Sequence, residues 1–232
     1  MQRIKRFTSQ YKHLYTLFIF IPLLLWFKYC EEHITPKYIM HTAFDDKIPF
    51  IKFFIIPYVI WYFYVAFGLI YVGLISKRDY YKLLIFITAG MSTCYILYMI
   101  FPNGHDLRPE IYGDDIFSKT IKFLYSIDTS TNVCPSIHVF NSIGVDAALL
   151  NISSHKKHMA SFITMIIICL STLFIKQHCI IDLIYGVILA VIFYIPIYAI
   201  PNIKQYKSYY KGREYKLSEI FKIAMNYTTI TT

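Results

Sequence analysis

The stretch at residues 53–75 reads FFIIPYVIWYFYVAFGLIYVGLI and contains no charged residue. An α-helix needs about 20 residues to cross a hydrocarbon core of ~30 Å, so this stretch is long enough to span a membrane. Four further apolar runs approach or reach that length, at residues 14–30, 83–101, 159–175 and 180–200. These runs predict an all-α integral membrane protein.

The composition of the whole chain supports the same class. Apolar residues make up 56% of the 232 residues and charged residues only 16%, against about 45–50% and about 25% in soluble domains. No internal repeat, low-complexity tract or Gly/Ser-rich linker divides the chain. We therefore expect a single membrane domain over residues 1–232.

A sixth run, at residues 137–152, is more polar because it carries His138, Asn141 and Asp146. A central Asp costs roughly 2.5–3.5 kcal/mol on insertion scales, and such residues usually face the interior of a helix bundle. With this run counted as a span, the loops alternate correctly between the two sides. The fold prediction is therefore a bundle of six transmembrane helices.

Lys and Arg residues accumulate in short cytoplasmic loops, and they set the expected orientation. With six spans, 15 of the 23 Lys and Arg residues fall on the side that holds both termini. Both termini are then cytoplasmic in a multi-pass protein of the cell membrane, and segments 30–52, 102–136 and 176–179 face outward. Glu31-Glu32 follows the first run in place of a small-residue cleavage site, which indicates an uncleaved signal anchor.

The net charge of +9 includes a basic cytoplasmic tail at residues 201–232. A basic stretch directly after a span is typical of contact with anionic lipid headgroups, so the expected partner is the bilayer and no nucleic acid partner is predicted.

Three clusters meet on the outward side under this topology: Arg108-Pro109, the segment Cys134-Pro-Ser-Ile-His138, and the segment from Ser171 to Asp182. Metal-free phosphoryl transfer needs a nucleophile, a group that orients it, an acid for the leaving oxygen, and positive charge for the phosphate oxygens. The three clusters together contain residues suited to all four tasks.

His178 and Asp182 are four residues apart, so on a helix they share a face and the carboxylate holds one ring nitrogen while the other attacks phosphorus. An unperturbed histidine has a reference pKa of about 6.5, so His138 is a candidate for proton transfer to the leaving group. The predicted catalytic residues are therefore His178, His138 and Asp182.

Phosphate binding is assigned to a second group of residues. Ser136 stands where the fourth span begins, and a helix N-terminus is a natural phosphate cradle. Arg108 and Lys176 supply a cationic clamp, with fork geometry from Arg and a point charge from Lys.

These clusters resemble the three motifs of the type 2 phosphatidic acid phosphatase superfamily, Lys-x6-Arg-Pro, Pro-Ser-Gly-His and Ser-Arg-x5-His-x3-Asp. Arg108-Pro109 matches the first, Pro135-Ser-Ile-His138 the second, and Ser171, His178 and Asp182 the third. The resemblance covers roughly residues 50–200. It implies a lipid phosphate substrate, a phosphohistidine on His178, protonation of the leaving group by His138, and a phosphate-binding role for Ser171.

The departures from the motifs leave the reaction open. Phe101, Ile137 and Thr172 stand where the family has Lys, Gly and Arg. The resemblance makes Lys176 a candidate to replace the missing Arg and His105 a candidate to replace part of the charge of the missing Lys. The Pro-Ser-x-His and Lys-Gln-His patterns resemble the branch that includes inositol phosphorylceramide synthase-like proteins. Water as acceptor makes a phosphatase, whereas a lipid or polyol hydroxyl makes a phosphotransferase. A hypothesis of another class is a transporter or scaffold that uses Asp146 and Asp182 for an ion path.

The remaining polar residues receive structural interpretations. Asp146 is interpreted mainly as a packing partner between helices, and the spacing of His41 and Asp45 has no phosphate-cradling motif beside it. No paired Cys or His spacing predicts a metal site, so neither a metal nor a cofactor is expected. A disulfide among the three outward cysteines is left open: Cys30, Cys134 and Cys179.

Overall fold

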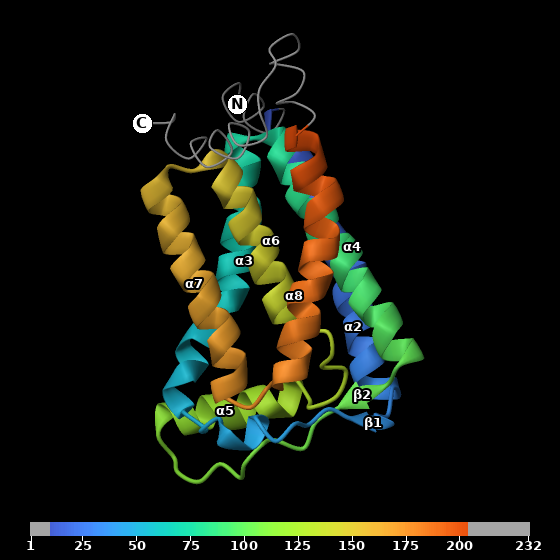
Figure 1. Cartoon of the computed structure of the whole chain (residues 1–232), viewed down its shortest axis with the longest axis vertical. Helices are drawn as coiled ribbons and strands as arrows, with labels where there is room; N and C mark the ends of the chain where they lie inside the picture. The colour runs from blue at the N-terminus through green and yellow to red at the C-terminus, as the bar shows by residue number, and fades with distance from the viewer. Residues whose placement is uncertain (1–9, 204–232) are drawn as a thin grey trace, which may run out of the picture.

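The computed structural model describes residues 10–203, which form a bundle of long helices (Figure 1). Within this range, five helical stretches are long and apolar enough to cross a membrane: Lys12–His33, Lys52–Ile75, Lys77–Ile100, His155–Phe174 and Ile180–Ile203. They overlap the five apolar runs, so the prediction of a helical protein with several helices able to span a membrane is confirmed. The predicted basic tail from Lys204 lies outside the described residues.

Residues 10–203 contain long helices, short helical turns and one pair of short strands. In order they are η1 (Lys12–Ile19), α2 (Phe20–His33), β1 (Tyr38–Ile39), η2 (Asp45–Lys47), η3 (Lys52–Phe54), α3 (Ile55–Ile75), α4 (Lys77–Ile100), β2 (Asn103–Gly104), α5 (Ile116–Ile127), α6 (Ile137–Ile152), α7 (His155–Phe174), α8 (Ile180–Tyr194) and η4 (Ile195–Ala199). Helix α6 has the bounds predicted for the sixth run.

Helix α6 is the central element of the bundle and packs against α3, α4, α7 and α8. Most of its side chains from Ile137 to Leu149 are buried. The polar residues of the sixth run therefore face the protein interior. Their burial explains why this run is less apolar than the other five.

The outer surface of the bundle is apolar over much of its length. Large hydrophobic side chains are exposed on all five long helical stretches, including Leu25, Phe63, Ile85, Ile163 and Ile192. A contiguous apolar surface of this kind is rare on a soluble monomer. It agrees with contact between these helices and lipid.

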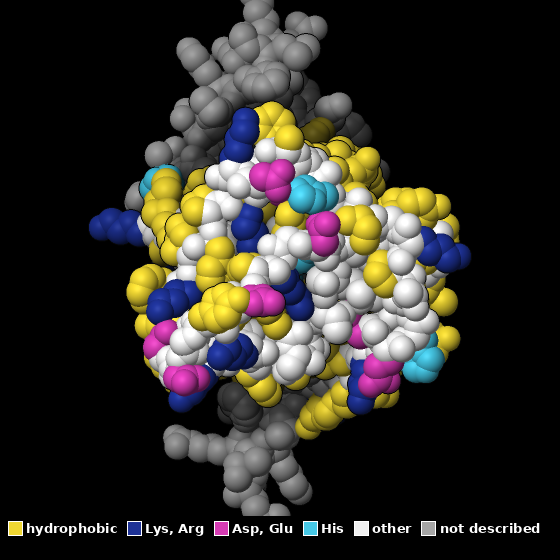
Figure 2. Space-filling model, turned by 90° about the horizontal axis from the view of Figure 1, so that it is seen from below, with side chains coloured by type: hydrophobic (Ala, Val, Ile, Leu, Met, Phe, Trp, Pro, Cys, Tyr) yellow, Lys and Arg dark blue, Asp and Glu magenta, His cyan; other side chains and the backbone are white. Residues whose placement is uncertain are grey.

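One end of the bundle carries the connecting segments 34–54, 101–136 and 175–179 (lower end of Figure 1). Strands β1 and β2 pair in parallel, with Tyr38 opposite Asn103 and Ile39 opposite Gly104. Helix α5 lies across this end, and charged side chains of both signs are scattered among hydrophobic ones over the same face (Figure 2). Neither α5 nor the strand pair was predicted from the sequence.

Close packing between α4 and α6 depends on Gly90. A Cβ atom at this position would lie 2.0 Å from the ring of Phe140, which is fully buried and stacked on Phe86. Gly90→Val is expected to destabilise the protein by about 3 kcal/mol, because overpacking forces the ring or the helix to move. The measurement is the midpoint of thermal unfolding in detergent. Ile85→Phe enlarges an exposed side chain of the same helix and should leave that midpoint nearly unchanged; equal midpoints for both variants would contradict the packing argument.

Candidate active site

The turn between α7 and α8 places His178 at the inner side of the bundle end. The N–H groups of Gln177 and His178 both donate to Thr172 O, at 2.9 and 3.1 Å, and Lys176 adopts a left-handed φ of 54°. His178 Nδ1 then lies 3.3 Å from Asp182 Oδ2. The predicted pairing is found, although His178 precedes α8, so the two residues do not share a helix face as the spacing suggested.

Asp182 owes its position to the start of α8. Its Oδ2 accepts the N–H of Cys179 at 2.9 Å, which makes Asp182 the capping carboxylate in the first turn of the helix. The positive end of the helix dipole favours a carboxylate at this position. Asp182 is fully buried, and its Oδ1 has no hydrogen-bond partner among the described residues.

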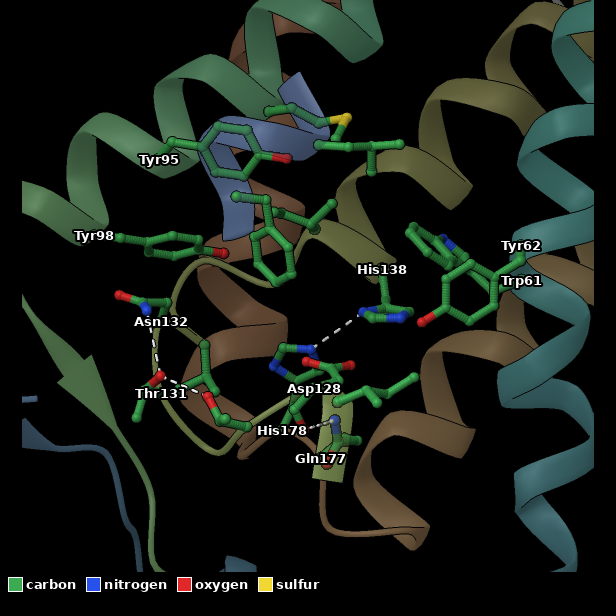
Figure 3. A pocket seen from close by; sticks show the side chains of 17 residues that line it. Trp61, Tyr62, Tyr95, Tyr98, Asp128, Thr131, Asn132, His138, Gln177 and His178 are labelled. Carbon is green, nitrogen blue, oxygen red and sulfur yellow. Dashed lines mark hydrogen bonds between the residues drawn. The ribbon is translucent and has the colours of Figure 1, made fainter. Parts of the chain in front are cut away.

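His138, in the first turn of α6, faces His178. The two rings point toward each other, with His178 Nε2 3.4 Å from His138 Nδ1 (Figure 3). The ring of His138 lies 4.0 Å from that of Trp61 and 4.5 Å from that of Tyr58, measured between centroids. The other nitrogen, Nε2, is buried without a partner among residues 10–203.

The contacts of His178 with Asp182 and with His138 are consistent with one set of proton positions on the two rings. An ionised Asp182 accepts from Nδ1–H of His178, which leaves Nε2 of His178 as an acceptor. His138 then donates Nδ1–H to that nitrogen. This arrangement leaves His178 with a lone pair on the nitrogen that faces His138, as a nucleophile requires.

The first turns of α6 and α8 are joined by their backbones. Ser136 N donates to Asp182 O at 3.1 Å, and Ser136 Oγ caps α6 by accepting from Val139 N at 3.4 Å. A Cβ atom at Gly186 would lie 2.9 Å from Ser136 O, so the glycine permits this close approach. Ser136 therefore lies at the start of α6, as predicted, two residues before His138. Its hydroxyl already accepts a hydrogen bond from within α6.

A cavity of about 160 Å³ opens beside the two histidines (Figure 3). Its apolar wall comes from α2, α3, α4 and α6 and includes Trp61, Tyr95 and Tyr98. Its polar wall comes from Asp128, Thr129, Thr131 and Asn132 and from Gln177, His138 and His178. No Lys or Arg of the described range lines this cavity.

Arg108 does not line the cavity but contacts Gln177, which does. Its guanidinium donates hydrogen bonds to oxygens of the protein. Its guanidinium contacts Gln177 Oε1, Asp128 O at 2.6 Å and Tyr125 O at 3.2 Å, and it stacks over the ring of Tyr125 at 4.2 Å. Burial lowers the pKa of Arg108 from its ordinary value. The structure therefore brings Arg108 near the histidines through Gln177, and a phosphate contact of Arg108 stays a prediction.

Lys176 and Ser171 have partners elsewhere. Lys176 Nζ donates to Asp45 O at 2.7 Å, and burial lowers the pKa of this amine. Ser171 is fully buried and its hydroxyl donates to Ile168 O at 2.6 Å within α7. Neither residue lines the cavity, and their predicted phosphate-binding roles stay predictions.

His105 does not supply the positive charge considered for it. Its Nδ1 accepts from Leu107 N at 3.2 Å, so its Nε2–H donates to Gln177 O at 2.9 Å. Burial lowers the pKa of His105 to about 4. A neutral His105 instead supports the backbone of the turn that carries His178.

Several residues of the site were not assigned from the sequence. Gln177 joins Arg108 to Tyr58, since its Nε2 lies 3.4 Å from Tyr58 Oη, and Tyr58 donates to Asp128 Oδ2 at 2.8 Å. The Lys-Gln-His pattern draws attention to Gln177, but a single glutamine predicts no contact. Asp128 is the C-cap residue of α5 and begins the irregular segment 128–136, where no periodicity indicates its orientation.

The polar residues interpreted as structural lie apart from the histidine pair. Asp146 accepts from Ser161 Oγ at 2.8 Å and lies 3.3 Å from His158 Nε2, which confirms its interpretation as a packing partner between α6 and α7. His41 contacts Asp46 and Asp106, at 2.7 and 3.0 Å, rather than Asp45, and the two carboxylates raise its pKa.

Cys30, Cys134 and Cys179 are buried free thiols. Within residues 10–203, no cluster of three or more His, Cys, Asp or Glu side chains is arranged to hold a metal ion. No protein-family model, no curated protein and no solved structure matches this chain.

Proposed function

We propose that the chain is a lipid phosphatase of the type 2 phosphatidic acid phosphatase kind, which hydrolyses a phosphate monoester or diphosphate through a phosphohistidine. The observation that carries the proposal is the chain of contacts from Asp182 to His178 at 3.3 Å and from His178 to His138 at 3.4 Å. Both histidines line a cavity. A carboxylate that orients one imidazole against a second imidazole is an arrangement suited to nucleophilic and acid–base catalysis.

In the first half-reaction, Nε2 of His178 bonds to phosphorus while the bond from phosphorus to the leaving oxygen breaks. His138, in its doubly protonated form, gives one proton to that oxygen, and the alcohol leaves. In the second half-reaction, water attacks the phosphohistidine, His138 takes the proton of that water, and phosphate leaves His178. Because the two nitrogens are 3.4 Å apart in the resting site, an entering phosphoryl group has to separate the rings.

The proposed membrane arrangement has six spans, with α6 as the fourth, both termini cytoplasmic and the histidines toward the outside of the cell membrane. The 16 residues of α6 rise ~24 Å, less than a hydrocarbon core of ~30 Å. Figure 1 shows that its first turn stops short of the lower ends of α7 and α8. Buried residues 132–136 continue from that point toward the bundle end, and this position within the protein makes an irregular segment tolerable at membrane depth.

A phosphotransferase is the second candidate, and the polar wall of the cavity favours it. Asn132 Oδ1 is a buried acceptor without a partner among the described residues, and the Asp128 carboxylate also lines the cavity. Such acceptors suit the hydroxyl groups of a polyol. Transfer of radiolabelled phosphate from a lipid phosphate to an added alcohol, in preference to water, would select this candidate.

Phosphate release from a lipid phosphate in the presence of a chelator is the direct test. Purified protein in detergent with EDTA is expected to release phosphate at the rate seen without EDTA, because the proposed steps use imidazole and carboxylate groups only. Loss of activity with EDTA and its rescue by magnesium would contradict the mechanism. Absence of release and of transfer across a panel of phosphatidic acid, phosphatidylglycerol phosphate and polyprenyl diphosphate would favour a transporter or scaffold.

A further inference from the structure

The apolar side of helix α5 has two sectors, of which only one faces the protein. Ile121 and Leu124 are buried and belong to a hydrophobic cluster with Ile55 and Tyr58 of α3. A second sector is exposed: Ile116, Phe123 and Ile127 expose 70%, 64% and 58% of their surface. The rest of the protein therefore covers Ile121 and Leu124 but leaves the apolar side chains of Ile116, Phe123 and Ile127 exposed.

The exposed residues form a continuous stripe. Positions 116, 120, 123 and 127 follow one another at intervals of four, three and four residues, which places them on one face of a helix. Thr120, the remaining residue of the stripe, donates its hydroxyl to Ile116 O at 2.7 Å. The polar sector of α5 lies beside the stripe and contains Lys119, Lys122 and Ser126.

The depth of α5 along the bundle follows from its packing on the first turn of α3. From Ile55 to Ile75, α3 contains 21 residues and rises ~31 Å, which matches the hydrocarbon thickness of ~30 Å. A helix packed on Ile55 and Tyr58 therefore lies at one boundary of the hydrocarbon. Figure 1 shows it crosswise to the long helices, as a helix in the membrane plane would lie.

We propose that α5 is an interfacial helix whose exposed stripe is covered by the lipid leaflet on the side of the histidines. Acyl chains next to the headgroups cover Ile116, Phe123 and Ile127, continuing the apolar surface of the neighbouring α3. Lys119 reaches the phosphate layer, as cations of amphipathic interfacial helices do, while Lys122 donates to Gly113 O at 3.0 Å on the polar side of the helix. Since Ile127 also lines the cavity, the stripe ends at the wall of the candidate active site.

Tryptophan quenching by brominated lipid tests this placement in the full chain. Phe123→Trp and Lys122→Trp variants are reconstituted in vesicles of phosphatidylcholine brominated near the headgroup end of its acyl chains. The emission of Trp26 and Trp61 is subtracted with the parent protein. The added emission of the Phe123→Trp variant is expected to lie at shorter wavelength, and to be quenched at least about twofold more than that of Lys122→Trp, because only the stripe enters the acyl region.

An Ile85→Trp variant, exposed on the middle of α4, serves as the positive control and must be quenched by deeper bromines. Equal quenching of the Phe123→Trp and Lys122→Trp variants, with water-like emission from both, would overturn the proposal. Emission of the Phe123→Trp variant at short wavelength without bromine quenching would also overturn it, and would identify a second copy of the chain as the cover. Neither result depends on enzymatic activity.

Discussion

Replacing His178 by Ala is expected to abolish turnover and any trapped phosphoenzyme, because His178 Nε2 is the proposed nucleophile. Replacing His138 by Ala should lower turnover of alkyl esters by about 10²- to 10⁴-fold, the usual contribution of a general acid. The His138→Ala variant should still be phosphorylated slowly by p-nitrophenyl phosphate, whose leaving group needs little protonation. The structure motivates this contrast because the two rings face each other from different helices at 3.4 Å.

The measurement is acid-quenched trapping of radiolabelled protein, in parallel with steady-state turnover of both ester types. Thermal unfolding of each variant separates loss of chemistry from loss of fold. His158→Ala, which removes a histidine from the α6–α7 interface at the other end of the bundle, is the matched control and should retain turnover. Phosphoenzyme in the His178→Ala variant, or equal losses on both ester types in the His138→Ala variant, would show that the roles are assigned incorrectly.

Asp182→Asn is expected to lower the rate of phosphoenzyme formation by about 10²- to 10⁴-fold, comparable with loss of the carboxylate in other histidine-based sites. The amide keeps the size of the side chain but removes the negative charge that orients Nδ1–H of His178. That charge also stabilises the ring as Nε2 bonds to phosphorus. The effect should fall on kcat more than on KM, because Asp182 does not line the cavity.

Asp146→Asn is the matched substitution of a second buried carboxylate on a packed helix, hydrogen-bonded to Ser161. It should alter thermal stability and leave phosphoenzyme formation within about threefold of the parent rate, a change of less than 1 kcal/mol in activation free energy. If Asp182→Asn reacts as fast as Asp146→Asn, the carboxylate has only a structural role at the start of α8.

The apolar runs were sufficient to predict the five long helical stretches, because a membrane imposes both length and composition on a spanning segment. The bounds of α6 were recovered from a run that contains His138 and Asp146, since Pro135 and Ser136 mark where it begins. Helix α5 was missed although its apolar residues gather on one side of the helix. The resulting 12-residue pattern is too short to resemble a span.

The candidate site was predictable in its residue types but less so in its contacts. The clustering of His138, His178 and Asp182 followed from motif order and from the expected topology, and the structure brings these three residues together. The hydrogen-bond partners of Arg108 and Lys176 could not be predicted, because a long cationic side chain can reach many different oxygen atoms. Here Arg108 bonds to Gln177 and to backbone carbonyls, and Lys176 to Asp45 O.

The sequence by itself determined the helical class, the apolar helices and the residues able to perform acid–base chemistry, because these depend on local composition and spacing. Only the tertiary structure decided that His178 faces His138, that Arg108 is held behind Gln177, and that α5 lies across the bundle end. The physical reason is that these features depend on contacts between residues distant in the chain. His138 and His178 are 40 residues apart and meet only because α6 and α8 pack closely at Gly186.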